Sequence, residues 1–185
     1  MTLKEYFGQH GIAAKGVPAL LAEFQEVKYK AGQTIIDMGE NAKRVGLILE
    51  GLVRGRYLDE EGKDVTKCFS KEGDWCGYYS FLQTGPSPFG IEALEDCRIA
   101  MIYADRLHAL IEGDAKLQKL YMELSQKAFL QVEEKSGSFQ RMDAKERYLI
   151  FLKQYPDISQ RAKQEHIASY LGITPSSLSR IKRGL

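Results

Sequence analysis

The segment from Gln164 to Arg183 constrains the fold of this chain more than any other part of the sequence. Its apolar and small residues fall where two short helices joined by a tight turn need them. The residues that fill this pattern are Ile167, Ala168, Leu171, Gly172, Ile173, Leu178 and Ile181. Glycine suits the turn because it adopts a positive φ without strain. Thr174 suits the N-cap of the second helix and Pro175 its first position. The pattern predicts a helix-turn-helix.

A helix-turn-helix can be a packing motif alone, so the exposed face of its second helix decides between packing and DNA binding. That face carries serine, lysine and arginine, and no acidic residue follows Glu165. Arg180 can donate two hydrogen bonds to guanine O6 and N7, and serine hydroxyls pair with several base edges. Lysines, arginines and the backbone N–H groups at helix starts suit phosphates. We predict DNA binding by Lys163, Gln164, Thr174, Ser176, Ser177, Arg180, Lys182 and Arg183.

The charge distribution supports the same interpretation. The chain has 26 Lys and Arg against 25 Asp and Glu, but the two signs are unevenly spread. Residues 1–140 hold 17 basic and 21 acidic side chains, a net −4, whereas residues 141–185 hold 9 and 4, a net +5. A basic segment on an acidic body is typical of a polyanion-binding module joined to a sensor.

From about Val27 to Ile102 the sequence is typical of short strands and turns. Glycines recur at short intervals, and runs of β-branched and aromatic residues lie between them. Several runs alternate apolar and polar side chains, the period of half-buried strands. The run Asp59–Lys63 has the turn chemistry of a hairpin tip. Many short strands with regular turns predict an antiparallel sandwich or barrel of the jelly-roll type.

From Asp105 to Ser136 the apolar period changes to that of a helix. An alternating four–three step, typical of a coiled-coil seam, is kept by Leu117, Tyr121, Leu124, Ala128 and Gln131. Two interpretations are open: the helix packs on its own domain, or it associates with a second copy of the chain. We favour self-association, because a helix of this length has more apolar face than one sheet covers. The run Ser136–Ser138 is predicted to break the helix as a hinge.

The third zone of the chain is small and helical. Asp143 and Glu146 form a capping-box pattern for an amphipathic helix over Ala144–Tyr155, which Pro156 stops. The predicted fold class is α+β: an N-terminal antiparallel β-roll of the jelly-roll type with flanking helices, a long dimerisation helix and a small C-terminal helix-turn-helix domain. The predicted boundaries are 1–112 for the roll, 113–138 for the long helix and hinge, and 139–185 for the helix-turn-helix domain.

Several function classes find no support in the sequence. No window approaches about 18 uninterrupted apolar residues, so we expect no membrane helix. The first residues lack the pattern of a secretory signal, so we expect a cytoplasmic protein. Cys68, Cys76 and Cys97 do not have the spacing of a metal motif. Because nucleophile-elbow, P-loop and His-x-His motifs are also missing, we expect no enzyme, no catalytic residue, no metal site and no cofactor.

Five segments spread over the chain carry a family resemblance. They are Lys30–Ile36, Val45–Arg54, Glu72–Gly77, Ala144–Leu149 and Ile167–Ile181. On these segments the chain resembles the Crp/Fnr family of bacterial transcription regulators. The resemblance implies a cyclic-nucleotide-binding-type β-roll that senses a signal, a long dimerisation helix, and a helix-turn-helix that binds double-stranded DNA. It also implies a homodimer and a two-fold symmetric target with half-sites about one helical turn apart.

The sequence departs from this family at the ligand-binding cassette. Members that bind cyclic AMP use a Glu for the ribose hydroxyl and an Arg, followed by Ser or Thr, for the cyclic phosphate. Here Tyr78 stands in place of the Glu, and Pro88 and Phe89 in place of the Arg-Ser pair. A buried phosphate without a cation is strongly disfavoured, so we expect no cyclic AMP binding. The candidate pocket residues are Gly77, Tyr78, Tyr79, Pro88 and Phe89. They line either an apolar pocket for another small-molecule effector or a roll filled by its own side chains.

The second helix of the helix-turn-helix departs from the family as well. Pro175 and Ser176 replace the usual Arg-Glu pair, and only Arg180 keeps a family base-contacting position. We therefore expect sequence specificity to depend mainly on Arg180, Ser176 and Ser177. The predicted function is a dimeric DNA-binding transcription regulator whose sensor has lost the cyclic AMP ligands. The alternative is a ligand-binding sensor module that acts through a protein partner and binds DNA weakly.

Overall fold

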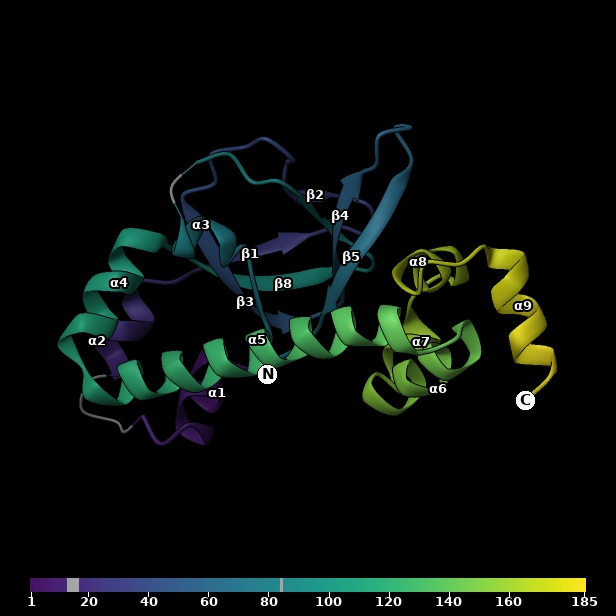
Figure 1. The fold of residues 1–185 in the computed structure, drawn as a ribbon. Helices are drawn as coiled ribbons and strands as arrows, with labels where there is room; N and C mark the ends of the chain where they lie inside the picture. Colours follow the sequence, from purple (N-terminus) through teal and green to yellow (C-terminus); the bar gives the residue numbers. More distant parts are fainter. Residues whose placement is uncertain (13–16, 84) are drawn as a thin grey trace.

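The computed structural model describes residues 1–12, 17–83 and 85–185. Two four-stranded antiparallel sheets form a β-roll, with strand orders β1-β8-β3-β6 and β2-β7-β4-β5 (Figure 1). The strands are β1 (Gln25–Tyr29), β2 (Thr34–Ile36), β3 (Arg44–Glu50), β4 (Val53–Leu58), β5 (Asp64–Ser70), β6 (Trp75–Cys76), β7 (Gly90–Ala93) and β8 (Cys97–Tyr103). The predicted fold class is confirmed, including the roll of the jelly-roll type.

The core of the roll lies where β3 pairs with β8. Both strands are buried over most of their length, and Ile48 and Ile99 face each other with no exposed area. Gly46 lies at a close approach of the two strands. A Cβ there would stand 2.5 Å from Cγ2 of Ile99, which leaves no room for a side chain. At the predicted hairpin tip between β4 and β5, the Asp59 carboxylate accepts a hydrogen bond from the Lys63 N–H at 2.9 Å. The turn chemistry of that segment is confirmed.

Helices cover the roll at one end and along one side (Figure 1). They are α1 (Leu3–Gln9), α2 (Val17–Ala22), α3 (Tyr79–Leu82), α4 (Ala104–Gly113) and α5 (Ala115–Arg141). Leu117 and Leu120 of α5 pack with Tyr6 and Phe7 of α1 and with Leu47 of β3 in one buried cluster. In the described ranges, no helix is both long and apolar enough to cross a membrane.

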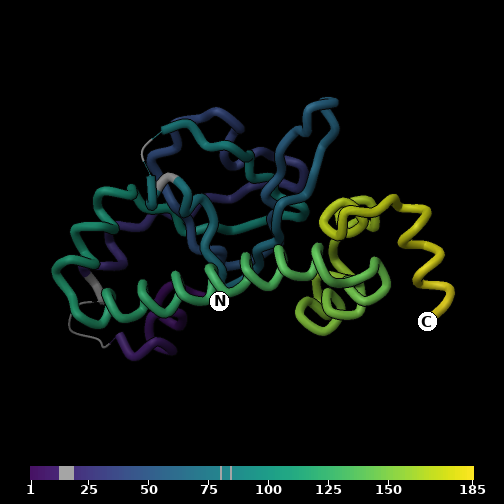
Figure 2. The backbone as a smooth tube through the Cα atoms, in the orientation of Figure 1, coloured from purple at the N-terminus to yellow at the C-terminus, as the bar shows by residue number. Residues whose placement is uncertain are grey.

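Helix α5 runs without a break from the helical end of the roll to the C-terminal part of the chain (Figure 2). The run Ser136–Ser138 lies inside this helix, so the predicted hinge there was wrong. The hydroxyl of Ser138 donates to the carbonyl of Lys135 at 2.7 Å, and the serine thereby satisfies its polar group within the helix. The chain leaves the helical conformation at Met142 instead (φ −121°, ψ 146°).

The C-terminal part, residues 144–183, is called the head below. Its helices are α6 (Ala144–Gln154), α7 (Ile158–Arg161), α8 (Gln164–Tyr170) and α9 (Pro175–Arg183). Asp143 and Glu146 form the predicted capping box at the start of α6. Helices α8 and α9 form the predicted helix-turn-helix, with Gly172 at φ 68° between them. Buried residues that hold the head together are Phe151, Ile158, Ile167, Ala168, Leu171 and Leu178.

The head packs directly on the roll. Leu52, beside β4, and Phe69 of β5 belong to the same buried cluster as the apolar residues of the head. The Thr66 N–H of β5 donates to Ser169 Oγ of α8 at 2.9 Å. The predicted domain boundaries stay a prediction, but the core of the head includes side chains of the roll.

Candidate nucleic-acid interface and sensor site

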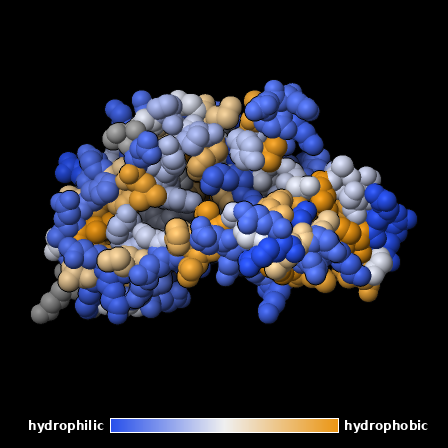
Figure 3. All heavy atoms as spheres, in the orientation of Figure 1, coloured by the Kyte–Doolittle hydropathy of each residue, from blue (hydrophilic) through white to orange (hydrophobic). Residues whose placement is uncertain are grey.

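Helix α9 lies at the outer end of the head with one face uncovered (Figure 1). Leu178 anchors the opposite face, since its side chain is fully buried in the core of the head. The exposed side chains of α9 include Ser176, Arg180, Lys182 and Arg183. In the space-filling view, this end of the molecule has hydrophilic side chains at its tip beside an apolar area (Figure 3). The uncovered face is therefore cationic and polar, which is the chemistry that phosphates and base edges require.

The predicted contact residues at the start of α9 come together. Thr174 Oγ1 accepts a hydrogen bond from the Ser177 N–H at 3.1 Å and lies 2.9 Å from Ser176 Oγ. One turn later, Nη2 of Arg180 lies 3.5 Å from Ser177 Oγ. The hydroxyls of Ser176 and Ser177 are thus held near the N-cap residue Thr174. The Arg180 side chain lies on the exposed face, and within the described chain its guanidinium makes only this one long hydrogen bond.

Lys163 and Gln164 are on a different element, at the start of α8. Lys163 occupies the N-cap position but makes no capping hydrogen bond, because a lysine side chain has no acceptor. Its Nζ lies 3.8 Å from Oε1 of Glu165, and both side chains are well exposed. Such a surface pair contributes little to stability, so Lys163 remains available to a phosphate.

One basic residue near α9 was missed by the sequence analysis. Lys145, in the first turn of α6, lines a hollow of about 370 Å³ together with Ser177, Arg180, Ile181 and Gly184. Its exposed ammonium extends the cationic face of α9 onto α6. The sequence analysis counted Lys145 in the net charge of residues 141–185. No motif linked it to α9, because that helix begins thirty residues later in the chain.

Ion pairs fasten α7 of the head to the roll. Nη1 of Arg161 donates to Glu72 at 3.0 Å, and Nη2 donates to both Glu72 and Glu95. Lys71 Nζ and Asp157 Oδ2 form a second pair at 2.7 Å. Burial acts to raise the pKa of Glu72, but the hydrogen bonds from Arg161 and the backbone outweigh it and hold that pKa below its ordinary value.

The apolar residues that α5 exposes are not those predicted for its seam. Leu117 is buried in the chain's own core and Leu124 packs against the same cluster, so the interpretation of packing on its own domain holds for that face. A second face exposes Met122, Phe129, Val132 and Phe139. These residues also fall at coiled-coil spacing, with serines at the intervening positions. The sequence therefore contained the signal, but the more strongly apolar face is the one that the roll covers.

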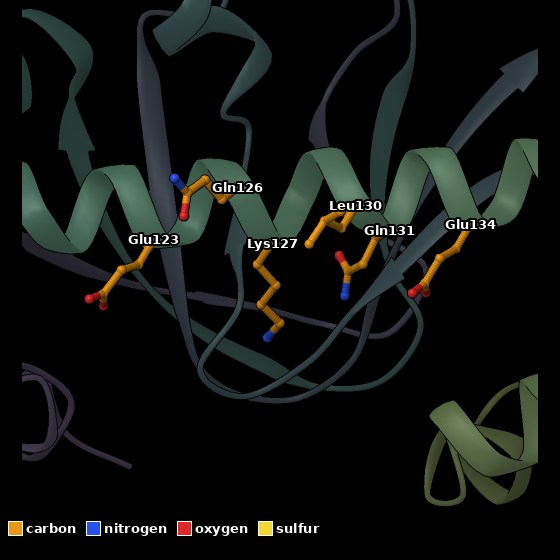
Figure 4. A pocket seen from close by; sticks show the side chains of 6 residues that line it. All are labelled: Glu123, Gln126, Lys127, Leu130, Gln131 and Glu134. Atoms are coloured by element: carbon orange, nitrogen blue, oxygen red, sulfur yellow. The ribbon is translucent and has the colours of Figure 1, made fainter.

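A shallow hollow of about 490 Å³ lies along a third side of α5. Its lining side chains are Glu123, Gln126, Lys127, Leu130, Gln131 and Glu134 (Figure 4). Five of the six are polar or charged, and all come from one helix. Among the residues that the structure describes, no buried polar group from a second element lines this hollow, so it lacks the convergent polar groups of an effector site.

Two of the predicted pocket residues lie against each other in the roll. The ring centres of Tyr79 and Phe89 are 6.0 Å apart in an edge-to-face arrangement. Phe89 is only 7% exposed and packs over Gly55, where a Cβ would stand 3.6 Å from its Cδ2. The backbone at Pro88, by contrast, places that side chain in an exposed position. Phe89 therefore occupies space that the predicted pocket would offer.

The other residues of this stretch have structural surroundings of their own. Gly77 has a φ of 75°, and a Cβ there would stand 2.8 Å from Cδ1 of Ile36. The Tyr78 hydroxyl is largely buried, which raises its pKa. Phe81 does not join Phe89 but stacks on His108, with ring centres 3.8 Å apart. Within the described residues, no group of three or more His, Cys, Asp or Glu could hold a metal ion.

Known proteins share both the sequence pattern and the fold. Residues 26–114 match the family model of the cyclic nucleotide-binding domain. The cAMP-activated global transcriptional regulator CRP of Salmonella typhimurium is 26% identical over 171 residues, which cover 85% of this chain and 80% of that protein. FixK2 from Bradyrhizobium japonicum has a similar structure, with a TM-score of 0.76 at 23% identity over 88% of this chain and 84% of that one. A CRP/FNR-family transcriptional regulator from Thermus thermophilus has a TM-score of 0.69 at 20% identity, over 85% and 83%.

Proposed function

We propose that this chain is a CRP/FNR-type transcription regulator that works as a homodimer and binds double-stranded DNA through α9 of each copy. The observation that carries the proposal is the uncovered face of α9, which is cationic and free of acidic side chains. Support also comes from the relative in Salmonella typhimurium, which is named as a global transcriptional regulator.

The residues of the head divide between two kinds of DNA contact. Arg180 is suited to a guanine edge in the major groove, and Ser176 to a neighbouring base. Lys145, Lys182 and Arg183 suit phosphates on either side, as do the helix starts at Thr174 and at Lys163 and Gln164. With the family's Arg-Glu pair missing, Arg180 carries most of the direct base recognition.

The exposed face of α5 supports the dimer. Met122, Phe129, Val132 and Phe139 form an apolar stripe that a second copy of the same stripe covers when two helices pair about a two-fold axis. A two-fold axis along α5 brings two heads to the same end of the assembly. Two-fold symmetric DNA sites require this arrangement.

The sensor of this regulator is proposed to respond to a small molecule other than cyclic AMP. In the sequence, Phe89 stands in place of a phosphate ligand of the family, and its buried ring has the Lys67 ammonium 4.3 Å from its centre. Isothermal titration calorimetry with cyclic AMP is therefore expected to give no heat of binding at micromolar concentrations. Saturable binding in that range would contradict the loss of the cyclic nucleotide chemistry.

The DNA-binding proposal is tested by selecting bound sites from random duplex DNA and measuring affinity for them. Arg180→Ala is expected to lose roughly 10- to 100-fold for the selected site and to relax the preference at one base pair. Lys182→Ala is expected to lower the affinity for all duplex sequences equally. It is also expected to reduce the slope of log affinity against log salt concentration by about one, because one phosphate contact is lost. Lys119→Ala, an exposed lysine on α5, serves as the control and changes neither quantity. Failure of the chain to bind any duplex at low salt would favour the alternative, a sensor that acts through a protein partner.

A further inference from the structure

Lys135 lies at the point where α5, the roll and the head meet. Its Nζ donates to the Lys67 carbonyl of β5 at 2.6 Å and stands 3.9 Å from the ring centre of Tyr170 in α8. The side chain is largely buried, and no carboxylate in the described part of the chain pairs with it. Burial accordingly lowers the pKa of Lys135 to about 8, with the nearby charge of Lys67 acting in the same direction and Cys68 opposing it. Desolvation of this ammonium is unfavourable, and its hydrogen bond to Lys67 and its contact with the Tyr170 ring offset part of that cost.

The two partners of this ammonium belong to different parts of the molecule. The Lys67 carbonyl belongs to the roll, whereas the Tyr170 ring belongs to the core of the head, where it packs on Phe69 and Phe151 with ring centres 5.5 and 5.6 Å away. If either partner moves, the buried charge loses one of its two close contacts, and only the more distant Phe139 ring, 5.9 Å away, remains besides the other. The position of β5 at Lys67 and the position of α8 at Tyr170 are therefore energetically linked through Lys135.

Lys67 extends this connection to the candidate pocket. Its own Nζ lies 4.3 Å above the Phe89 ring, and that ring fits closely over Gly55. A group that enters the roll at this place must displace Phe89, and the displacement removes the ring beneath the Lys67 ammonium. The preceding residue of the same strand, Thr66, donates its N–H directly to Ser169 of α8, so a shift of β5 reaches α8 by a second contact.

We propose that Phe89, Lys67, Lys135 and Tyr170 form a relay that transmits displacement of Phe89 in the roll to the helix-turn-helix. The relay rests on the proposed function, because it assigns the route by which the sensor acts on the DNA-binding head. Lys135 connects the two ends of this relay, because its ammonium contacts both Lys67 of the roll and Tyr170 of the head. It belongs neither to the candidate pocket nor to the proposed DNA contacts.

The test is native-state hydrogen exchange of the Leu171 amide in the full-length protein, because this N–H donates to the Ile167 carbonyl of α8. Phe89→Leu is expected to speed that exchange at least about fivefold, within the range of measured couplings between linked residues. In the Lys135→Met background, Phe89→Leu is expected to have a clearly smaller effect on the rate, because only the hydrogen bond between Thr66 and Ser169 then links β5 to α8. Lys135→Arg is expected to restore the effect, because a guanidinium keeps the charge and stacks on aromatic rings.

Phe81→Leu is the matched control. Phe81 is buried like Phe89 and comes from the same stretch of sequence, but it contacts His108 instead of Lys67. It is expected to leave Leu171 exchange unchanged in both backgrounds. Equal effects of Phe89→Leu with and without Lys135, or equal effects of the two phenylalanine variants, overturn the relay.

Affinity for the selected duplex separates the relay from the proposed function. If exchange is coupled but the chain binds no DNA, the relay stands and DNA binding fails. If the chain binds DNA and the exchange effects are independent of Lys135, DNA binding stands and the relay fails.

Discussion

A Phe129→Glu variant is expected to be a monomer in analytical ultracentrifugation at concentrations where the native chain is a dimer. Phe129 is 64% exposed in the single chain and lies in the middle of the apolar stripe on α5. In the proposed dimer the two-fold axis brings position 129 of one copy close to position 129 of the other. The substitution therefore buries two like charges in an apolar contact, at a cost of several kcal/mol. We expect a loss in dimer affinity of at least about 100-fold, and a comparable loss for a two-fold symmetric DNA site.

Leu130→Glu provides the control for this variant. Leu130 is the next residue on the same helix and is 59% exposed, but it lines the hollow on another side of α5 (Figure 4). Its side chain stays in water in the proposed dimer, so the variant is expected to remain dimeric. If both variants were dimeric, or both monomeric, the stripe through Phe129 would not be the contact between the copies.

The parts of the fold that depend on local chemistry could be predicted from the sequence. Glycines at turns, the hairpin tip at Asp59 and the capping box at Asp143 each act over a few residues. The helix-turn-helix is similar, because Gly172, Thr174 and Pro175 specify its turn and the start of α9 within four residues. These signals were sufficient to predict a zone of short strands and to identify the helix-turn-helix.

The parts of the fold that depend on packing between distant elements could not be predicted in the same way. Two faces of α5 have coiled-coil spacing, and only the position of the roll shows that the face through Leu117 and Leu124 is internal. The expected hinge at Ser136–Ser138 failed for a related reason. Serine and glycine weaken a helix, but packing of α5 against the roll and the head outweighs their intrinsic preference.

The contacts between the roll and the head were invisible to sequence reasoning, because the partners are far apart along the chain. Lys135 and Lys67 are 68 residues apart, and Arg161 is 66 and 89 residues from its two glutamates. Each residue alone resembles an ordinary surface charge in the sequence. Only their positions in space show that they join the roll to the head.

Arg161→Met is expected to lower the free energy of unfolding by about 2–3 kcal/mol at pH 7, because hydrogen bonds to charged groups contribute about 1.5–3 kcal/mol. Arg161 is partly buried and donates to the carboxylates of both Glu72 and Glu95. Without the guanidinium, these two carboxylates remain together in a partly desolvated site and repel each other. Urea unfolding of the native and variant chains measures the difference. Arg141→Met is the control, since Arg141 is exposed and only donates to a carbonyl of its own helix, and it is expected to change stability by less than about 0.5 kcal/mol.

The same variant makes a prediction about pH. The pKa of Glu72 is lowered in the folded chain, so its ionised form stabilises the fold above the ordinary glutamate pKa of 4.5. That contribution is lost as the pH falls through the lowered pKa, because the native state must then take up a proton that the unfolded state already holds. The stability difference between the native chain and Arg161→Met is therefore expected to be full at pH 7 and to shrink below pH 4.5. A difference that stayed constant down to about pH 3 would mean that Arg161 acts by packing, and that its charge does not hold the head on the roll.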